Sequence, residues 1–364
     1  MLQHSRAGGR RRETHVKQDR QHRVPTADDV ALLAGVSRSA VSRTFTEGAS
    51  VAPATREKVV AAARSLGYRV NFLARSLSRQ RTNLIGLVVS DLDNPFRAAM
   101  MDQIARRLIE EHYRPFVLPT ATGGDTRHLI DMMVHYNVCG AIVTGDASPG
   151  EIAEACAAYG VPLTLINKPE VGPTVANVSM DMDKAGRLMA EELYAAGCRR
   201  IALAGQERQS YSIGRRRDSF LRHARRLGLD IVGDFRGPVQ NYAGGVAAAE
   251  AFLAAGVTVD GVHCGNDYLA LGFLDHLRRR AGLRVPEDLK VIGCDDIAEA
   301  GWLSYDLTTI RQDPVEVARS AVDCLIGQID APDRPSPSMP AAKIVDVTLV
   351  RRGSTGAAPS SRGK

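Results

Sequence analysis

Polar side chains that could bind a small molecule follow short apolar runs of this chain. Asn266 and Asp267 come after the apolar residues 261–263, and Asp295 comes after residues 291–292. If these runs are parallel strands, their carboxyl ends meet at one sheet edge, where open α/β sheets bind ligands. The pattern indicates a binding edge, although a helix cap or a solvated side chain would explain each residue taken alone.

Basic residues, which could contact nucleic-acid phosphates, concentrate at the amino-terminal end. Residues 1–80 carry 15 Lys and Arg against 6 Asp and Glu, a net charge of +9, and the remaining residues carry 32 against 35, a net charge of −3. A basic end on a near-neutral body is typical of a nucleic-acid-binding head. A solvated basic tail would give the same charges, so charge alone leaves both interpretations open.

Signatures of catalysis and of metal binding are absent from the sequence. It contains no G-x-x-x-x-G-K-[ST] loop, no G-x-S-x-G elbow and no H-E-x-x-H pair. The six cysteines form no C-x-x-C pair and lie at no metal-ligand spacing from a histidine, so we expect reduced, mostly buried thiols. The sequence therefore predicts no enzyme, no metal and no cofactor.

The chain also lacks the apolar segments that membrane insertion or export requires. No stretch approaches the ~20 apolar residues of a membrane span, and no apolar segment follows the basic amino terminus as in a signal peptide. We expect a cytoplasmic protein that does not contact a membrane.

Three short helices are predicted in residues 25–70. Thr26, with an acidic residue three positions later, has the spacing of a helix N-cap and its partner. Gly35 allows a tight turn before Ser37, which can cap the second helix, and Pro53 begins the third. Two short helices joined by a glycine-containing turn are typical of a helix-turn-helix.

After residue 82 the pattern changes to short apolar runs that alternate with longer amphipathic stretches. This alternation predicts βαβ units around parallel sheets, and the length of the region favours two lobes. The fold class is therefore α/β, with an all-α head and a two-lobed, doubly wound core. The predicted segments are a basic disordered tail (1–24), a helix-turn-helix domain (25–70), a linker (71–81), the core (82–353) and a disordered tail (354–364).

Several motifs extend this interpretation. The amino-terminal end contains T-A-D-D-V-A-L-L-A-G-V-S-R-S-A-V-S-R (26–43), T-R-E-K-V (55–59), L-G-Y (66–68) and N-F-L-A-R-S-L (71–77). Further along are L-I-G-L-V-V-S-D-L-D-N-P-F (84–96), G-N-D-Y-L-A-L-G (265–272), V-I-G-C-D-D (291–296) and L-T-T-I-R-Q-D (307–313). From about residue 25 to residue 353 the chain resembles the lac/gal repressor (LacI) family. The resemblance implies a core similar to periplasmic sugar-binding proteins, with two lobes around a cleft.

For the head, the resemblance implies that the second helix is a recognition helix in the DNA major groove. Arg38, Ser39 and Arg43 would then face bases or nearby phosphates, and an arginine can bond a guanine bidentately. A contact to phosphate alone would position the head without specifying a sequence. The other expected DNA contacts are Thr26, Ser37, Ser42, Thr55 and Arg56.

Residues 71–77 correspond to the family's hinge helix, which orders on the operator and inserts a pair of leucines into the minor groove. Leu77 holds the position of that wedge, Ala74 that of a small residue needed for close approach, and Asn71 begins the segment. The family usually has a proline just before this asparagine, where this chain has Val70. A plain linker is the alternative interpretation.

For the cleft, the resemblance implies that Asp295 accepts hydrogen bonds from ligand hydroxyls and that Arg216 is the ligand-binding arginine. Phe96 could stack on a sugar face or simply pack in the core. The full set of expected effector-binding residues is Ser90, Asn94, Phe96, Asn167, Arg216, Asn266, Asp295 and Gln312.

The charge of the effector is a further expectation. Many relatives have an aspartate where this chain has Asn167, the next residue is Lys168, and Arg216 is flanked by Arg215 and Arg217. This favours a sugar acid or a phosphorylated sugar over a neutral sugar, because arginine binds carboxylate and phosphate well. The alternative is that the flanking cations face solvent, as most do.

The sequence therefore predicts a transcriptional repressor whose affinity for a pseudo-palindromic operator is controlled by a small molecule, a sugar or sugar acid. Family members pair through their cores, and the carboxyl-terminal tail has no leucine heptads, which favours a homodimer over a tetramer. A transport-type binding protein would explain the core but not the basic head.

Overall fold

The computed structural model describes residues 24–46, 48–69, 82–120, 126–145, 148–169, 172, 175–208, 210–330 and 342–356. The chain divides after Gln80 into two compact units. None of the described helices is both long and apolar enough to cross a bilayer.

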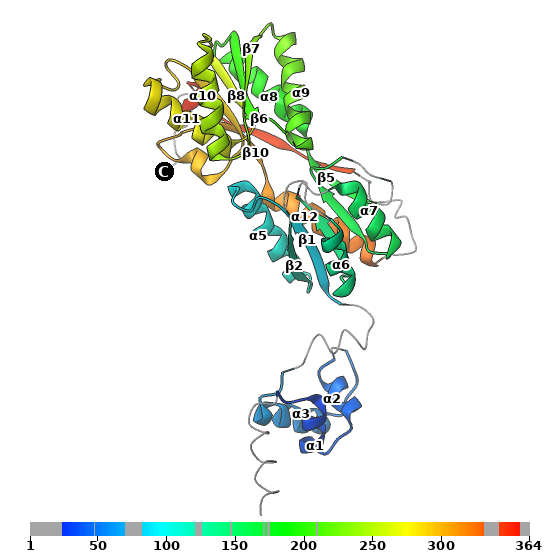
Figure 1. The fold of residues 1–364 in the computed structure, drawn as a ribbon. Helices are drawn as coiled ribbons and strands as arrows, with labels where there is room; N and C mark the ends of the chain where they lie inside the picture. The colour runs from blue at the N-terminus through cyan, green and yellow to red at the C-terminus, as the bar shows by residue number, and fades with distance from the viewer. Residues whose placement is uncertain are drawn as a thin grey trace, which may run out of the picture. The chain divides into compact units, whose positions relative to one another are not determined.

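The amino-terminal unit contains three helices, coloured blue in Figure 1: α1 (Ala27–Ala34), α2 (Arg38–Thr44) and α3 (Pro53–Leu66). Thr26 and Asp29 form a reciprocal capping box at the start of α1. Gly35 ends α1 with a φ of 64°, a left-handed conformation that glycine adopts without strain. Val30, Val41 and Val59, one from each helix, are almost completely buried together. The predicted helix-turn-helix is confirmed.

The first lobe of the second unit is built on a six-stranded sheet with the order β11-β5-β4-β3-β1-β2. All of its neighbouring strands pair in parallel. The strands are β1 (Leu84–Val89), β2 (Arg114–Pro119), β3 (Gly140–Val143), β4 (Leu163–Ile166), β5 (Ala176–Met180) and β11 (Ala342–Val345). Around it lie α5 (Pro95–Glu110), α6 (Arg127–His135), α7 (Pro149–Ala158) and α12 (Pro314–Asp330).

The second lobe repeats this plan with the strand order β12-β10-β9-β8-β6-β7. Only β12, paired with β10, is antiparallel within this sheet. The strands are β6 (Arg200–Gln206), β7 (Asp230–Gly237), β8 (Gly261–Cys264), β9 (Lys290–Asp295), β10 (Thr308–Gln312) and β12 (Val347–Val350). The helices are α8 (Met182–Ala195), α9 (Tyr211–Arg226), α10 (Tyr242–Ala255) and α11 (Asp267–Ala281), with short 3₁₀ turns η1 (Ala298–Gly301) and η2 (Gly353–Thr355).

Both sheets are covered on two faces, which explains their continuous apolar strands. In the second lobe α8 and α9 pack together on one face, and α10 and α11 pack together on the other (Figure 1). In the first lobe α5 and α12 cover one face and α6 and α7 the other. The predicted two-lobed, doubly wound α/β core is confirmed.

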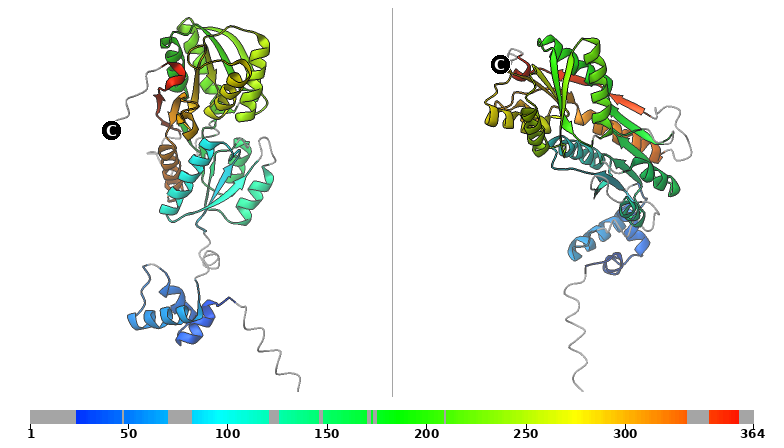
Figure 2. Two further views of the ribbon diagram at one scale, coloured as in Figure 1. Left: turned by 90° about the vertical axis from the view of Figure 1, so that its left-hand side faces the viewer. Right: turned by 45° about the horizontal axis from the view of Figure 1, so that its top comes forward.

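The chain crosses between the lobes at three places. It passes from β5 to α8, from β10 to α12, and from β11 to β12. In both views of Figure 2, the orange helix α12 lies against the first lobe, although it follows a strand of the second. The two lobes therefore join through several parallel connections, all of them at the ends of strands.

Residues 354 and 355, which were predicted to belong to a disordered tail, are part of the second lobe. Ser354 and Thr355 are buried in the second lobe, where the Ser354 hydroxyl donates to the Val291 carbonyl at 2.6 Å. The Thr355 hydroxyl donates to Glu192 at 2.9 Å. Small polar residues are typical of tails, but here their hydroxyls satisfy backbone and carboxylate groups of the lobe.

Candidate functional site

The outward face of α2 carries most of the polar side chains predicted to contact DNA. Arg38, Ser39, Ser42 and Arg43 are exposed, while Val41 and Thr44 on the opposite face are buried. Arg38 lies 3.7 Å from Asp28 in an ion pair whose two side chains are 72% and 63% exposed. Such an exposed pair contributes little to stability, so releasing the guanidinium to another partner would cost little.

The other predicted DNA contacts in the head also have roles within the fold. The Ser37 hydroxyl caps α2 by accepting from the Ala40 amide at 3.2 Å. The Thr26 hydroxyl belongs to the capping box of α1. Arg56 donates from Nη1 to the Thr44 carbonyl at 3.0 Å, which ties α3 to the end of α2. Thr55 lies half-buried in the first turn of α3.

The predicted hinge residues Asn71, Ala74 and Leu77 lie outside the described residues. Their roles stay predictions from the sequence.

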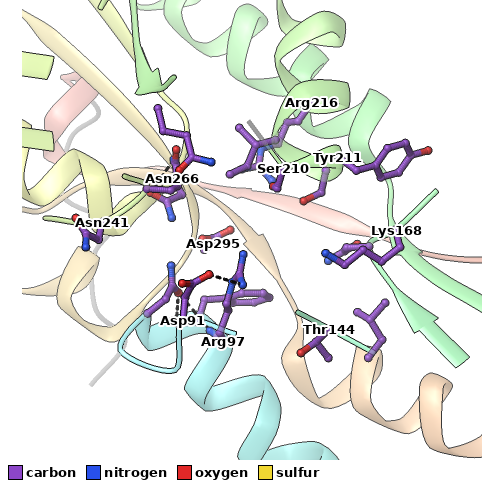
Figure 3. A pocket seen from close by; sticks show the side chains of 18 of the residues that line it. Asp91, Arg97, Thr144, Lys168, Ser210, Tyr211, Arg216, Asn241, Asn266 and Asp295 are labelled. Carbon is purple, nitrogen blue, oxygen red and sulfur yellow. Dashed lines mark hydrogen bonds and ion pairs between the residues drawn. The ribbon is translucent and has the colours of Figure 1, made fainter. Parts of the chain in front are cut away.

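The second unit contains a cavity of about 560 Å³ lined by residues from both lobes (Figure 3). Strand ends and the loops after them supply much of the lining, the position where open α/β sheets bind ligands. Seven of the predicted effector-binding residues are brought together here: Asn94, Phe96, Asn167, Arg216, Asn266, Asp295 and Gln312.

The eighth predicted residue, Ser90, does not line the cavity. It is buried, and Arg97 donates from Nη1 to both its hydroxyl, at 2.5 Å, and its carbonyl, at 3.3 Å. Arg97 does line the cavity. Ser90 therefore helps to hold a pocket residue and does not face the pocket itself.

Two of the asparagines predicted to bind the effector are also helix caps, which is the alternative that the sequence left open for polar residues of this kind. Asn94 caps α5 by accepting from the amides of Phe96 and Arg97. Asn266 caps α11 by accepting from the Leu269 amide at 3.0 Å. Capping holds each side chain in one position at the cavity wall, which is the preorganisation that a binding site needs.

A chain of hydrogen bonds joins the two lobes at the floor of the cavity. Asn167, at the end of β4, has a φ of 54° and accepts from the Met180 amide at 2.9 Å. Its amide group donates to Gln312 Oε1 at 3.4 Å, and Gln312 Nε2 donates to Asp295 Oδ1 at 2.7 Å. Asn167 belongs to the first lobe, whereas Gln312 and Asp295 end strands of the second.

The carboxyl group of Asp295 is buried beside a cation. Burial raises the pKa of Asp295 to about 6, and the Arg216 guanidinium opposes part of that rise. Arg216 is 3% exposed, and it donates from Nη2 to the Gly265 carbonyl at 2.5 Å. Asp295 and Arg216 thus offer an acceptor and a donor, the two functions needed to bind sugar hydroxyls.

Asp267, which follows a predicted strand just as Asn266 does, does not line the cavity. It is fully buried and accepts from the Thr309 hydroxyl at 2.6 Å and the Ile297 amide at 3.2 Å. Burial and the neighbouring Asp295 raise the pKa of Asp267 to about 8. Its hydrogen bonds link the start of α11 to β10 and to the residue that precedes η1.

Several lining residues were not among the predicted effector-binding set. They include Arg97, Thr144, Lys168, Gln206, Arg208, Ser210, Tyr211, Gln240 and Asn241. Thr144 comes directly after β3 and Gln206 ends β6, so the strand-end rule applied to every predicted strand would have identified these two residues. Gln240 comes shortly after β7, a strand that the sequence did not predict. Of the three cations singled out from the sequence for the charge of the effector, Lys168 lines the cavity, whereas Arg215 is exposed and Arg217 pairs with Asp234 at 2.6 Å.

Among the described residues, no group of three or more His, Cys, Asp or Glu side chains is placed to hold a metal ion.

Two family models match the chain. One, described as bacterial regulatory proteins of the lacI family, matches residues 26–71, and one described as a periplasmic binding protein-like domain matches residues 190–355. The chain is 31% identical over 347 residues to the HTH-type transcriptional regulator MalR of Streptomyces coelicolor, a match that covers 92% of this chain and 98% of that protein.

Solved structures show the same similarity. The lac repressor dimer bound to operator and the anti-inducer ONPF matches with a TM-score of 0.81 at 25% identity, covering 92% of this chain and 100% of that one. The complex of the transcriptional regulator CelR with cellobiose matches with a TM-score of 0.66 at 27% identity, covering 91% and 99%.

Proposed function

This chain belongs to the LacI family of DNA-binding transcriptional regulators, and we propose that it is a repressor whose operator affinity is set by a sugar-class effector in the cleft. The observation that carries the proposal is that one chain contains both a helix-turn-helix and a cavity between two lobes. A helix-turn-helix presents an exposed polar helix, and a cavity between two lobes collects polar side chains from both.

In the head, α2 is the proposed recognition helix. Arg38 and Ser39 at its first turn are proposed to read bases, since the amino-terminal residues of such a helix reach base edges. Arg43 is proposed to reach a base or a nearby phosphate. Thr26, Ser42, Thr55 and Arg56 are proposed as phosphate contacts, which set the register on the duplex without specifying its sequence.

In the cleft, Asp295 and Arg216 are proposed to bond the hydroxyls of the effector. Phe96 is 8% exposed and lines the cavity, where its ring offers an apolar face to a sugar. The similarity to CelR, whose structure contains cellobiose, supports a sugar-class ligand here. No chemical step is assigned to the cleft, and a regulator of this kind works in the cytoplasm, where its operator lies.

We propose a homodimer formed through the core. Near η1, the Trp302 and Leu303 side chains are 55% and 93% exposed, and exposed adjacent apolar side chains often mark an interface. The similar lac repressor is a dimer on its operator, which supports a second copy of this chain as the occupant. Two heads then require a near-palindromic operator, because its symmetry follows that of the protein.

The test selects binding sites from random DNA with the full-length chain and then measures operator affinity while sugars are added. Recovery of a near-palindromic site and a shift in affinity on adding one of the sugars are the expected results. Asp295→Ala should keep operator binding and lose the response, whereas Asp218→Ala, an exposed carboxylate of α9 outside the cavity, should keep both. Asymmetric sites would contradict the dimeric operator, and a normal response of Asp295→Ala would contradict the effector site.

A further inference from the structure

The backbone at the end of β9 adopts a conformation that residues with a side chain rarely take. Asp295, the last residue of β9, has a φ of 131°, and Asp296, which follows it, has a φ of 55°. Crowding at Cβ makes a positive φ costly for residues other than glycine. Such residues persist only where the surrounding structure holds them. Because Asp295 lines the cavity (Figure 3), whatever holds this backbone also decides where its carboxyl group lies.

Two arginines hold the carboxylate of Asp296, whose side chain is 8% exposed. Arg311 donates from Nε to its Oδ2 at 2.6 Å, and Arg352 donates from Nη2 to its Oδ1 at 2.5 Å. Both hydrogen bonds join opposite charges, which makes them stronger than neutral ones. We call these three residues the Asp296 clamp. None of them is among the described residues that line the cavity, so the clamp acts from outside the binding surface.

Arg352 is the better anchored of the two arginines. Its side chain is 18% exposed, against 54% for Arg311. Its Nη1 donates to the Leu307 carbonyl at 2.8 Å, and its backbone amide donates to the Thr308 hydroxyl at 2.8 Å. Leu307 and Thr308 lie where the chain enters β10. Arg352 therefore fixes Asp296 relative to the start of the neighbouring strand.

The pairing of β9 with β10 connects the clamp to the cavity. Arg311 lies beside Asp295 in the parallel register of these strands. Gln312, the next residue, donates from Nε2 to Asp295 Oδ1 at 2.7 Å and lines the cavity. The Asp295 carboxyl group is thus bonded by Gln312, while the clamp joins the residues that follow each of these positions or precede it. A binding group held in this way depends on its supporting residues for its geometry.

We propose that Arg352 and Arg311 are positioning residues of the effector site, which hold the carboxylate of Asp296 and thereby aim the Asp295 carboxyl group at the effector. This inference rests on the proposed function of the cleft as an effector site. Without Arg352, the Asp296 carboxylate loses half of its hydrogen bonds, and the left-handed backbone at Asp296 relaxes to a less strained conformation. Relaxation turns the Asp295 carboxyl group away from Gln312 and from the ligand. The carboxyl-terminal segment that carries Arg352 is thus part of the effector site, although it does not touch the cavity.

Arg352→Met and Arg351→Met form a matched pair of variants. Arg351 bonds the buried carboxylate of Glu192 at 2.7 Å, so each variant removes one ion pair to a buried carboxylate of the second lobe, and only Arg352→Met affects Asp296. Both should lower the melting temperature of the full-length chain. Crystal structures and hydrogen exchange without ligand should show a changed backbone at 295–296, a lost Asp295–Gln312 hydrogen bond and faster exchange around residue 296 in Arg352→Met alone. An unchanged backbone with wild-type exchange there would overturn the proposal. Arg311→Met gives the same test if Arg352→Met does not fold.

Calorimetry on the full-length chain with glucose, cellobiose and ribose measures the effect on binding. For a sugar that binds wild type, Arg352→Met should raise the Kd by roughly tenfold or more, and Arg351→Met should leave it unchanged. Asp296→Gly separates positioning from other effects of the arginine, because glycine adopts the left-handed conformation without strain and has no carboxylate to be held. In that background, adding Arg352→Met should change the Kd by less than about threefold. An equal loss of affinity in both backgrounds would refute positioning through Asp296.

The measurements also separate this proposal from the function on which it rests. The crystal structures and the exchange rates need no effector, so they decide the role of the clamp if none of the three sugars binds. A sugar that binds wild type and Arg352→Met with the same Kd would overturn the positioning role and leave the proposed function intact. Failure of the wild-type chain to select any operator would contradict the proposed function itself.

Discussion

Asp267→Asn is expected to remove most of the dependence of stability on pH that the floor of the cleft creates. Asp267 is fully buried at the start of α11, where its two oxygens accept from Thr309 and Ile297. Asparagine has the same shape. It can accept from the Ile297 amide through its oxygen and donate to the Thr309 hydroxyl through its nitrogen, so the substitution removes the ionisation and keeps the hydrogen bonds.

The sign and size follow from the raised pKa. Burial raises the pKa of Asp267 from 3.8 to about 8, so between these values the folded chain binds a proton that the unfolded chain has released. Stability is therefore full below about pH 4 and is lost as the pH rises toward 8. At ~1.4 kcal/mol per pKa unit, the loss between pH 5 and pH 8 is on the order of 4 kcal/mol.

The assay is urea denaturation of the full-length chain at several pH values, with the free energy of unfolding of wild type subtracted from that of the variant. Burial lowers the pKa of His263 to about 3, so this histidine makes stability change with pH in the opposite direction. Both chains contain His263, and the subtraction therefore removes its contribution. The difference in unfolding free energy should be near its smallest at pH 5 and should favour Asp267→Asn increasingly up to pH 8. Asp288→Asn is the control, because hydrogen bonds from Arg284 lower the pKa of that exposed carboxyl group to about 2, and its difference curve should be flat over this range. A flat curve for Asp267→Asn would refute the reasoning.

Three further predictions concern the head and the packing of the core. Arg38→Ala should relax base preference at one symmetric pair of operator positions, whereas Arg56→Ala should weaken all DNA sequences alike, and site selection with each variant distinguishes the two. Thr26→Ala should destabilise the head by about 1 kcal/mol through loss of the capping box, seen as faster hydrogen exchange in α1 of the full chain. Gly245→Ala should lower the melting temperature sharply, because its Cβ would lie 2.0 Å from the Leu269 carbonyl oxygen where α10 meets α11; an unchanged melting temperature would contradict this packing.

Elements with one strong local signal could be predicted from the sequence. The capping box at Thr26 and the left-handed turn at Gly35 are both present where the residues indicated. The central strands β1, β3, β4, β6, β8 and β9 were visible as apolar runs, because strands covered on both faces read as nearly continuous apolar residues. Strand β7 was not predicted, because it lies at the edge of its sheet and three of its eight residues, Asp230, Asp234 and Arg236, are charged.

The sequence could predict which residues lie at the cavity, but not which side chains those residues contact. Asp295 and Asn167 were identified because they follow strands, yet only the structure joins them through Gln312, more than a hundred residues away from Asn167. Ser90 has the residue type and position of a ligand contact, but Arg97 from the next helix occupies its hydroxyl. A side chain's partner depends on the tertiary packing, which no local pattern encodes.

The arrangement of the crossovers bears on how the cleft could control the head. The hydrogen-bond chain from Asn167 through Gln312 to Asp295 lies where β10 gives way to α12, so it spans one of the three connections between the lobes. Asp295 and Gln312 also line the cavity, which means that a ligand and this connection share the same hydrogen-bonding groups. A ligand that hydrogen-bonds to a member of this hydrogen-bond chain must weaken or strengthen the link between the lobes. Because binding free energies are coupled reciprocally, any lobe arrangement that DNA favours must change ligand affinity by the same factor as the ligand changes DNA affinity. Under the proposed function, the cleft floor would therefore serve both as the binding surface and as a joint between the two lobes.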